Sequence, residues 1–214
     1  MEYLTSCYRR QGEQGNSLLL QQYLCRQTPV CFACLCTCGG QRSREAARYI
    51  TGLLLVWCRR FPWRKAVDRP DSWLERARKG LEREITRGET ELRISGLLPE
   101  KQGTELTAIL CIGEEILVLG RGQCVYLLNT AFGKGGAKYL EGTFRGRIEP
   151  NVGILIATEA FGGQLTERAL GEALRPEELD TQAQADRHLA ELGRTGGKED
   201  HRNSAAVLLL AKRQ

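Results

Sequence analysis

Leu35-Cys36-Thr37-Cys38-Gly39-Gly40 ends a short apolar run that begins at Val30, and a helical pattern starts soon afterwards, near Ser43. An apolar strand that ends in a Gly-Gly turn before a helix is a common place for a phosphate or metal site. Such a site normally uses carboxylates, whereas cysteines stand in this turn. The stretch therefore predicts an enzyme scaffold that no longer does its chemistry.

The sequence on either side predicts an α+β protein. Residues 17–23 and 30–35 have the pattern of two strands close enough to pair antiparallel, and the second is apolar on both faces, as in the middle of a covered sheet. Residues 42–58 have the apolar spacing of a helix, and a second helix opens with a capping box at Ser72 and ends at Gly88. The other expected elements are strands over 92–94, 106–112, 116–119, 124–128, 153–158 and 203–212, and short helices over 165–174 and 180–192.

Size and composition indicate one packed domain over residues 1–214, because 42% of the residues are hydrophobic and 27% are charged. No apolar run approaches the roughly 18 residues that a membrane-spanning helix needs. The N-terminus lacks the basic and apolar regions of a signal peptide. Nine cysteines, an odd number without a secretion signal, argue against a disulfide framework. We therefore expect a cytoplasmic protein without a membrane span.

Positive charge is concentrated in the first third of the chain. Residues 1–70 carry 11 Lys or Arg against 4 Asp or Glu, although the net charge of the whole chain is only +5. The densest basic segment is Arg59-Arg60-Phe61-Pro62-Trp63-Arg64-Lys65. Such a segment can bind nucleic acid, a phosphoprotein or an anionic surface. Cations are also common at the exposed C-terminal end of a helix, where they complement the dipole. We favour this second interpretation and do not expect nucleic-acid binding.

Six short motifs follow one another in the order and spacing of a known family. In chain order they are Gln14-Gly15-Asn16-Ser17, Cys36-Thr37-Cys38-Gly39-Gly40, Gly103-Thr104-Glu105, Gly120-Arg121-Gly122-Gln123-Cys124, Thr158-Glu159-Ala160 and Arg202-Asn203. Through them, nearly the whole chain resembles the PPM-type (type 2C) metal-dependent protein serine/threonine phosphatases in their bacterial form. The resemblance implies a four-layer αββα sandwich of two antiparallel β-sheets flanked by helices.

The same resemblance implies a reaction for which this sequence lacks most of the ligands. Members of the family hydrolyse phosphoserine or phosphothreonine with two Mg²⁺ or Mn²⁺ ions, which need several anionic oxygen ligands. Where the family has metal-binding aspartates, this chain has Asn16, Cys36, Glu159 and Arg202. In addition, Thr37 replaces a glycine whose carbonyl is a ligand.

The resemblance also implies roles for three residues close in sequence to these motif positions, namely Asn203, Asp200 and Arg10. Asn203 stands where the family also has asparagine, but Arg202 before it would put a cation where a cation must bind. Asp200 could restore one carboxylate through a local bulge. The family's phosphate-binding arginine falls on Gln11, so Arg10 beside it is the phosphate-binding candidate.

Three hypotheses for the function follow. The first is a catalytically inactive, phosphatase-like binding or regulatory module that needs no cofactor and whose partner is a protein, for example a phosphoprotein or a kinase. The alternative is a metal-dependent serine/threonine phosphatase with a remodelled Mn²⁺ or Mg²⁺ site.

The third hypothesis is a zinc or redox protein that uses the cysteine-rich strand, with Cys31, Cys34, Cys36 and Cys38, together with Cys58. Side chains alternate along a strand, so we expect Cys31 to face away from the other three. We favour buried thiols without a ligand. The chain has two histidines, His188 and His201, and we expect His188 to be a packed residue of a helix and not a ligand.

Overall fold

The computed structural model describes residues 1–10, 15–100, 102–129, 131–132, 136–163, 165–195 and 204–213. Contacts group the chain into two compact units. Unit 1 consists of Met1–Glu13, Gln123–Gly142 and Ile148–Gln214, and unit 2 of Gln14–Gly122 and Thr143–Arg147. The expectation of a single domain over residues 1–214 stays a prediction.

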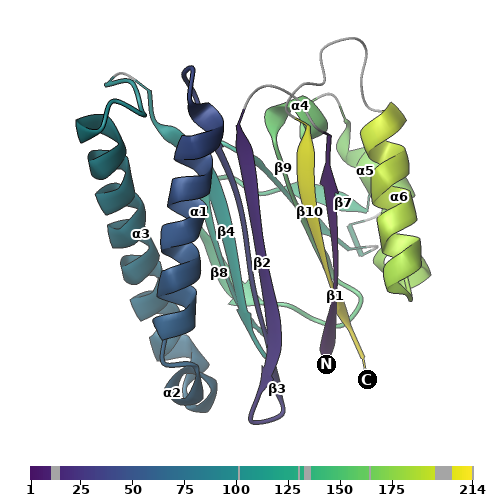
Figure 1. Cartoon of the computed structure of the whole chain (residues 1–214). Coiled ribbons are helices and arrows are strands. Elements are labelled where there is room, and N and C mark those ends of the chain that lie inside the picture. The colour runs from purple at the N-terminus through teal and green to yellow at the C-terminus, as the bar shows by residue number, and fades with distance from the viewer. Residues whose placement is uncertain are drawn as a thin grey trace. The chain divides into compact units, whose positions relative to one another are not determined.

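Unit 2 contains an antiparallel five-stranded sheet in the order β2-β3-β4-β5-β8 (Figure 1). Its strands are β2 (Asn16–Cys25), β3 (Thr28–Cys38), β4 (Thr104–Ile112), β5 (Glu115–Arg121) and β8 (Phe144–Arg147). The expected antiparallel pairing of the first two is confirmed, and β3 does lie in the middle, between β2 and β4. β8, which the sequence did not predict, forms one edge.

Three helices belong to unit 2, namely α1 (Ser43–Arg60), α2 (Trp63–Asp68) and α3 (Pro70–Ile94). Figure 1 shows α1 and α3 side by side along the sheet, and their buried side chains form one apolar cluster with those of β3 and β4. α3 begins at Pro70 and not with a capping box at Ser72, whose hydroxyl donates to the carbonyl of Arg69. α2 was not expected from the sequence.

The predicted end of the second helix at Gly88, and the strand predicted over 92–94, are wrong. α3 continues through Gly88 to Ile94. A Cβ atom at position 88 would lie 2.6 Å from Ile50 Cδ1 and 2.8 Å from Leu53 Cδ1. Gly88 is therefore the place where α3 passes close to α1, and its small size serves helix packing instead of helix termination.

Unit 1 contains a second antiparallel five-stranded sheet, in the order β1-β10-β9-β6-β7. Its strands are β1 (Glu2–Arg9), β10 (Ala205–Lys212), β9 (Gly153–Ala157), β6 (Cys124–Leu128) and β7 (Ala137–Tyr139). Its helical segments are α4 (Glu159–Gly162), α5 (Glu167–Ala173), the 3-10 turn Pro176–Glu178 and α6 (Gln182–Thr195). β1, β7 and α4 were not expected from the sequence. α6 contacts β1 and β10, and α5 contacts β7.

Two antiparallel sheets, each with helices of its own, confirm the expected α+β class. Gly113 lies in the hairpin turn between β4 and β5 and has a φ of +60°, a conformation that glycine adopts readily. None of the helices in the described part of the chain is long and apolar enough to cross a membrane.

Gly15 directly precedes β2 and packs against the start of α1, with no room for a side chain. Its N–H donates to Ser43 Oγ at 3.0 Å, and its carbonyl accepts from the N–H of Cys38 at 3.4 Å. A Cβ atom on Gly15 would lie 2.0 Å from the backbone nitrogen of Arg44. Because the obstacle is backbone, a side chain here would have to push the strand and the helix apart.

We therefore predict that Gly15→Ala lowers the free energy of unfolding by about 3 kcal/mol or more, as severe overpacking does. Gly52→Ala is the matched control, because position 52 lies in α1 with nothing within 4 Å of the added Cβ. It should raise the free energy of unfolding by about 0.5–1 kcal/mol, the helix preference of Ala over Gly. Urea denaturation followed by circular dichroism measures both. Equal stability of the two variants would contradict the close approach.

Candidate functional site

Asn16 and Thr37 face each other across β2 and β3, at the end of the unit 2 sheet where α1 begins. In the next strand Thr37 is opposite Glu105, and Thr37 Oγ1 donates to Glu105 Oε2 at 3.2 Å. Residues opposite each other on paired strands point to the same face of a sheet. Asn16, Thr37 and Glu105 therefore form one polar row, with Asn16 buried and Glu105 exposed.

Cys36 points to the other face of the same sheet. It is fully buried and belongs to the apolar cluster that β3 forms with α1 and α3. A hydrogen bond with Cys38, and then burial, hold the pKa of the Cys36 thiol well above its usual value. The structure thus separates Cys36 from Asn16 and Thr37, although the sequence-based site includes all three.

A carboxylate already occupies the helix-facing side near Cys36. Glu89 of α3 is buried, and its Oε1 accepts from the N–H of Thr104 at 3.3 Å and from the hydroxyl of Thr104. Arg121 Nη1 lies 3.7 Å from the same oxygen. The negative charge of Glu89 also contributes to the raised pKa of Cys36. The Gly103-Thr104 motif therefore anchors a structural carboxylate of α3.

Two further candidates lie at one end of the unit 1 sheet, on either side of the start of β10. Arg10 follows β1 and is exposed, and its N–H donates to the carbonyl of Ser204 at 2.9 Å. Glu159 is the first residue of α4, directly after β9 and Thr158, and is also exposed. Both side chains are therefore available to a ligand.

Several of the predicted positions lie outside the described residues, namely Gln11, Asp200, His201, Arg202 and Asn203. Their roles stay predictions. The other histidine, His188, is a partly buried residue of α6 whose Nδ1 lies 2.9 Å from the carbonyl oxygen of Ala173. This contact fits the expectation that His188 packs within unit 1.

The cysteine-rich strand has the alternation expected of it. Cys34, Cys36 and Cys38 belong to the apolar cluster under the helices, as does Cys58, whereas Cys31 lies opposite Cys111 and outside that cluster. Burial raises the pKa of the Cys58 thiol to about 12 and also raises that of Cys34. Since zinc and oxidants both react with thiolates, buried protonated thiols suit neither role.

Across the described ranges, no group of three or more His, Cys, Asp or Glu side chains is arranged to hold a metal ion. The cysteine-rich strand therefore belongs to no such metal-holding group in these ranges, and the redox form of the third hypothesis stays a prediction. The polar row of Asn16, Thr37 and Glu105 contributes one anionic oxygen donor group. Hard divalent cations require more than this.

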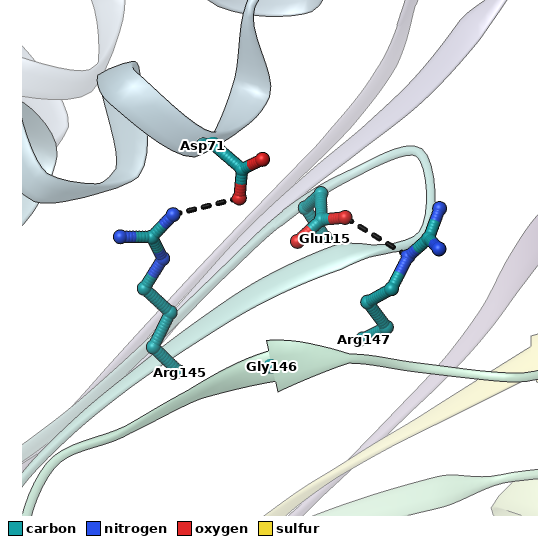
Figure 2. Close-up of a pocket in the computed structure, with 5 residues that line it drawn as sticks. All are labelled: Asp71, Glu115, Arg145, Gly146 and Arg147. Carbon is teal, nitrogen blue, oxygen red and sulfur yellow. Dashed lines mark hydrogen bonds and ion pairs between the residues drawn. The ribbon is translucent and has the colours of Figure 1, made fainter.

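A second polar feature of unit 2 is a pocket of about 490 Å³ beside the edge strand β8. Figure 2 shows Arg145 and Arg147 projecting from β8 toward carboxylates on α3 and β5. Arg145 Nη2 lies 2.7 Å from Asp71 Oδ1, and Arg147 Nε lies 3.0 Å from Glu115 Oε1. Each guanidinium thus has a carboxylate partner, so the pocket is internally neutralised. These ion pairs attach β8 to its neighbours and leave no unpaired arginine for an anion.

Glu105 is the residue that sequence reasoning missed. It is the third residue of the Gly103-Thr104-Glu105 motif and an acidic residue near the start of an otherwise apolar strand. That contrast was the available signal. Its position beside Thr37 depends on the register between β3 and β4, which the sequence did not provide.

No family model and no curated protein match the sequence. Solved structures do match it along its length. The serine/threonine phosphatase PstP/Ppp of Mycobacterium tuberculosis is 13% identical, with a TM-score of 0.67 and 99% of each chain covered. The catalytic domain of PstP in complex with two manganese ions is 15% identical, with a TM-score of 0.65 over 99% of each chain. PppA, a key regulatory component of T6SS in Pseudomonas aeruginosa, is 15% identical, with a TM-score of 0.68 over 99% of this chain and 98% of that one.

This likeness confirms the fold that the sequence resemblance implied: the chain has the fold of the PPM-type serine/threonine phosphatases. At identities of 13–15% the likeness establishes the fold alone. The chemistry has to be argued from the residues of this chain.

The position of Cys36 leads to a stability prediction. Cys36→Asp would place a carboxylate in the apolar cluster near Glu89, and we expect a loss of about 3–5 kcal/mol in the free energy of unfolding, typical of an uncompensated buried charge. Thr37→Asp puts the same group on the opposite, partly exposed face beside Glu105, and should cost about 1 kcal/mol or less. Thermal and urea unfolding compare the two with Cys36→Ala. A Cys36→Asp protein as stable as Thr37→Asp would show that residue 36 faces the polar row.

Thiol accessibility leads to a second prediction. All nine cysteines are free, and six of them are buried, whereas Cys7 is exposed and Cys25 and Cys124 are half-buried. We expect Ellman's reagent to react with at most these three in the folded protein and with all nine in denaturant, because buried protonated thiols are poor nucleophiles. Elemental analysis of the purified protein should find no zinc. Rapid reaction of four or more thiols in the native state, or one zinc ion per chain, would revive the thiol-site hypothesis.

Proposed function

We propose that this chain is a phosphatase-fold protein that acts as a binding or regulatory module and does not hydrolyse phosphoesters. The observation that carries this proposal is the placement of Cys36. It stands where the resemblance puts a metal-binding aspartate, yet its side chain is fully buried in the cluster under α1 and α3.

The chemistry of the remaining donors supports the same conclusion. An Mg²⁺ or Mn²⁺ pair needs several carboxylate oxygens, whereas the polar row supplies the neutral groups of Asn16 and Thr37 and one carboxylate, Glu105. Arg202, whose structure is not described, adds a cation to the sequence-based site. The described residues therefore do not supply the ligand set that the resemblance implies for a dimetal centre.

A second candidate is a working phosphatase with a remodelled Mn²⁺ or Mg²⁺ site. Glu159 at the start of α4 supports this alternative, because it is an exposed carboxylate. It is also the one aspartate position of the resemblance that keeps a negative charge in this chain.

A regulatory role is compatible with what is known of the fold. PppA is a key regulatory component of T6SS, and we propose that this chain likewise regulates through a protein partner, for example a phosphoprotein or a kinase. Nine free cysteines also favour a reducing compartment, for which the cytoplasm is our proposal.

The decisive experiment measures hydrolysis of p-nitrophenyl phosphate and of a phosphothreonine peptide with and without Mn²⁺, beside an active phosphatase of this fold. We expect no Mn²⁺-dependent turnover above the buffer rate, and no heat of Mn²⁺ binding in calorimetry, because the carboxylate ligands are too few.

Variants make the assay specific. Glu105→Gln and Glu159→Gln should leave the background rate unchanged if the protein is inactive. Turnover comparable to the active phosphatase and lost on chelation would overturn the proposal, and a reduced rate in one of the two variants would identify the carboxylate involved.

A further inference from the structure

A groove of about 330 Å³ runs between α1 and α3 of unit 2, next to the turn that follows α1. Its lining combines apolar and charged side chains, and it does not involve the polar row described above. The apolar members are Leu53, Val56, Trp57, Phe61 and Pro62, and the charged members are Arg60, Arg83, Glu84 and Arg87.

The apolar part of the groove rests on a packed aromatic cluster. The ring of Phe61 lies 4.9 Å from that of Trp57, 4.5 Å from that of Trp63 and 5.7 Å from that of Trp73, between centroids. Trp63 Nε1 donates to the carbonyl of Cys58 at 2.8 Å. At Gly80 of α3 a Cβ would lie 2.7 Å from Trp57 Nε1, so the indole passes close to the helix backbone. These contacts hold the aromatic rings, which form the floor of the groove, in place without a ligand.

Two apolar residues of the lining, Val56 and Pro62, are exposed. Val56 is 45% exposed, and it lies on α1 one turn before Arg60. An exposed aliphatic residue beside partly exposed aromatic rings provides a surface that gains free energy when another apolar side chain covers it.

The charged part of the groove carries surplus positive charge. Glu84 is the one carboxylate of the lining, and its Oε2 pairs with Arg87 Nη2 at 2.8 Å, while Arg83 Nε lies 3.9 Å from its other oxygen. Among the described residues Arg60 has no ion-pair partner, and the same holds for Arg59, Arg64 and Lys65. Of this basic segment, Arg60 lines the groove together with Arg83 and Arg87 of α3.

Arg59 and Arg60 occupy the last turn of α1, where positive charge complements the helix dipole, and this accounts for their presence. It does not explain Arg83 and Arg87, which come from the middle of α3. Arg87 has two ion-pair partners in its own helix, Glu84 at 2.8 Å and Glu91 at 3.7 Å, whereas Arg83 lies 3.9 Å from Glu84. The convergence of cations from two helices beside an apolar floor is therefore a tertiary feature with a binding surface as its natural use.

We propose that this groove binds an acidic peptide segment of a partner protein, which places one large apolar side chain against Val56 and the aromatic floor and its carboxylates against Arg60 and Arg83. A volume of about 330 Å³ suits one or two side chains. Glu84 in the lining and the apolar floor favour a peptide over the continuous phosphate backbone of a nucleic acid. This proposal is independent of the proposed loss of hydrolysis.

The test uses intrinsic fluorescence, because all three tryptophans of the chain, Trp57, Trp63 and Trp73, belong to the cluster under the groove. The probe is a Glu/Asp-rich peptide with one central phenylalanine and no tryptophan. We expect saturable binding with a dissociation constant of about 1–100 μM, as for a small exposed interface. The same peptide with serine in place of phenylalanine should bind at least about 10-fold more weakly, since it lacks the buried apolar group.

The matched variants have the same change in net charge. Arg60→Glu/Arg83→Glu should weaken binding of the phenylalanine peptide at least about 10-fold, because two attractive charges become repulsive. Arg48→Glu/Arg93→Glu changes two exposed arginines of the same helices outside the groove and should leave the affinity within about 2-fold. Val56→Ser should remove most of the difference between the phenylalanine and serine peptides. Circular dichroism melts verify that each variant is folded.

Three outcomes would overturn the proposal: an absence of saturable binding, equal losses in the groove and control variants, or preferential binding of a single-stranded oligonucleotide over the peptide. The last would identify the surface as a nucleic-acid site. None of these outcomes depends on the phosphatase assay, so failure here is distinguishable from failure of the proposed function.

Discussion

The pairing of β3 with β2 on one side and β4 on the other is the constraint on which unit 2 depends. β3 is buried almost throughout, so each of its residues is committed to one of two faces. Even-numbered residues from Val30 to Cys38 join the cluster under α1 and α3. Because side chains alternate with a period of two, a slip of one residue would move that whole set to the other face.

This register decides on which face of the sheet each residue of the Cys36-Thr37-Cys38 stretch lies. Thr37 lies on the same face as Asn16 and Glu105. Cys36 lies on the opposite face, which α1 and α3 cover, close to the carboxylate of Glu89. The difference between a half-buried position on the polar row and a buried core position is therefore one step along the strand. The backbone turn survives, with Gly40 at a φ of +93°, while the charge expected before it is absent.

The helices add a second feature that no local pattern contains. α1 and α3 approach closely at Gly88 and Gly80, where glycine leaves room for Ile50 and Trp57. That approach also brings arginines of α3 beside the basic end of α1. In sequence, Gly88 resembled a helix terminator and the basic segment resembled a solvated helix end. Both interpretations considered one helix at a time, whereas the observed arrangement is a property of the pair.

Local patterns predicted what depends on local chemistry. Apolar spacing found α1 and most of β3 to β6. The order of degenerate motifs was enough to identify the fold. β1, whose residues are half polar, was missed because its pairing partner β10 lies at the other end of the chain. α2 was missed because it has only six residues and prolines, Pro62 and Pro70, stand on either side of it.

By itself, the sequence determined the class and the family likeness, since these are matters of residue type and order. Only the tertiary structure decided that Cys36 is buried, that Glu105 joins Thr37, and that the basic segment meets α3 over an aromatic floor. The reason is that strand register and helix contacts are set by residues far apart in the chain, and a linear pattern carries no information on which of them meet.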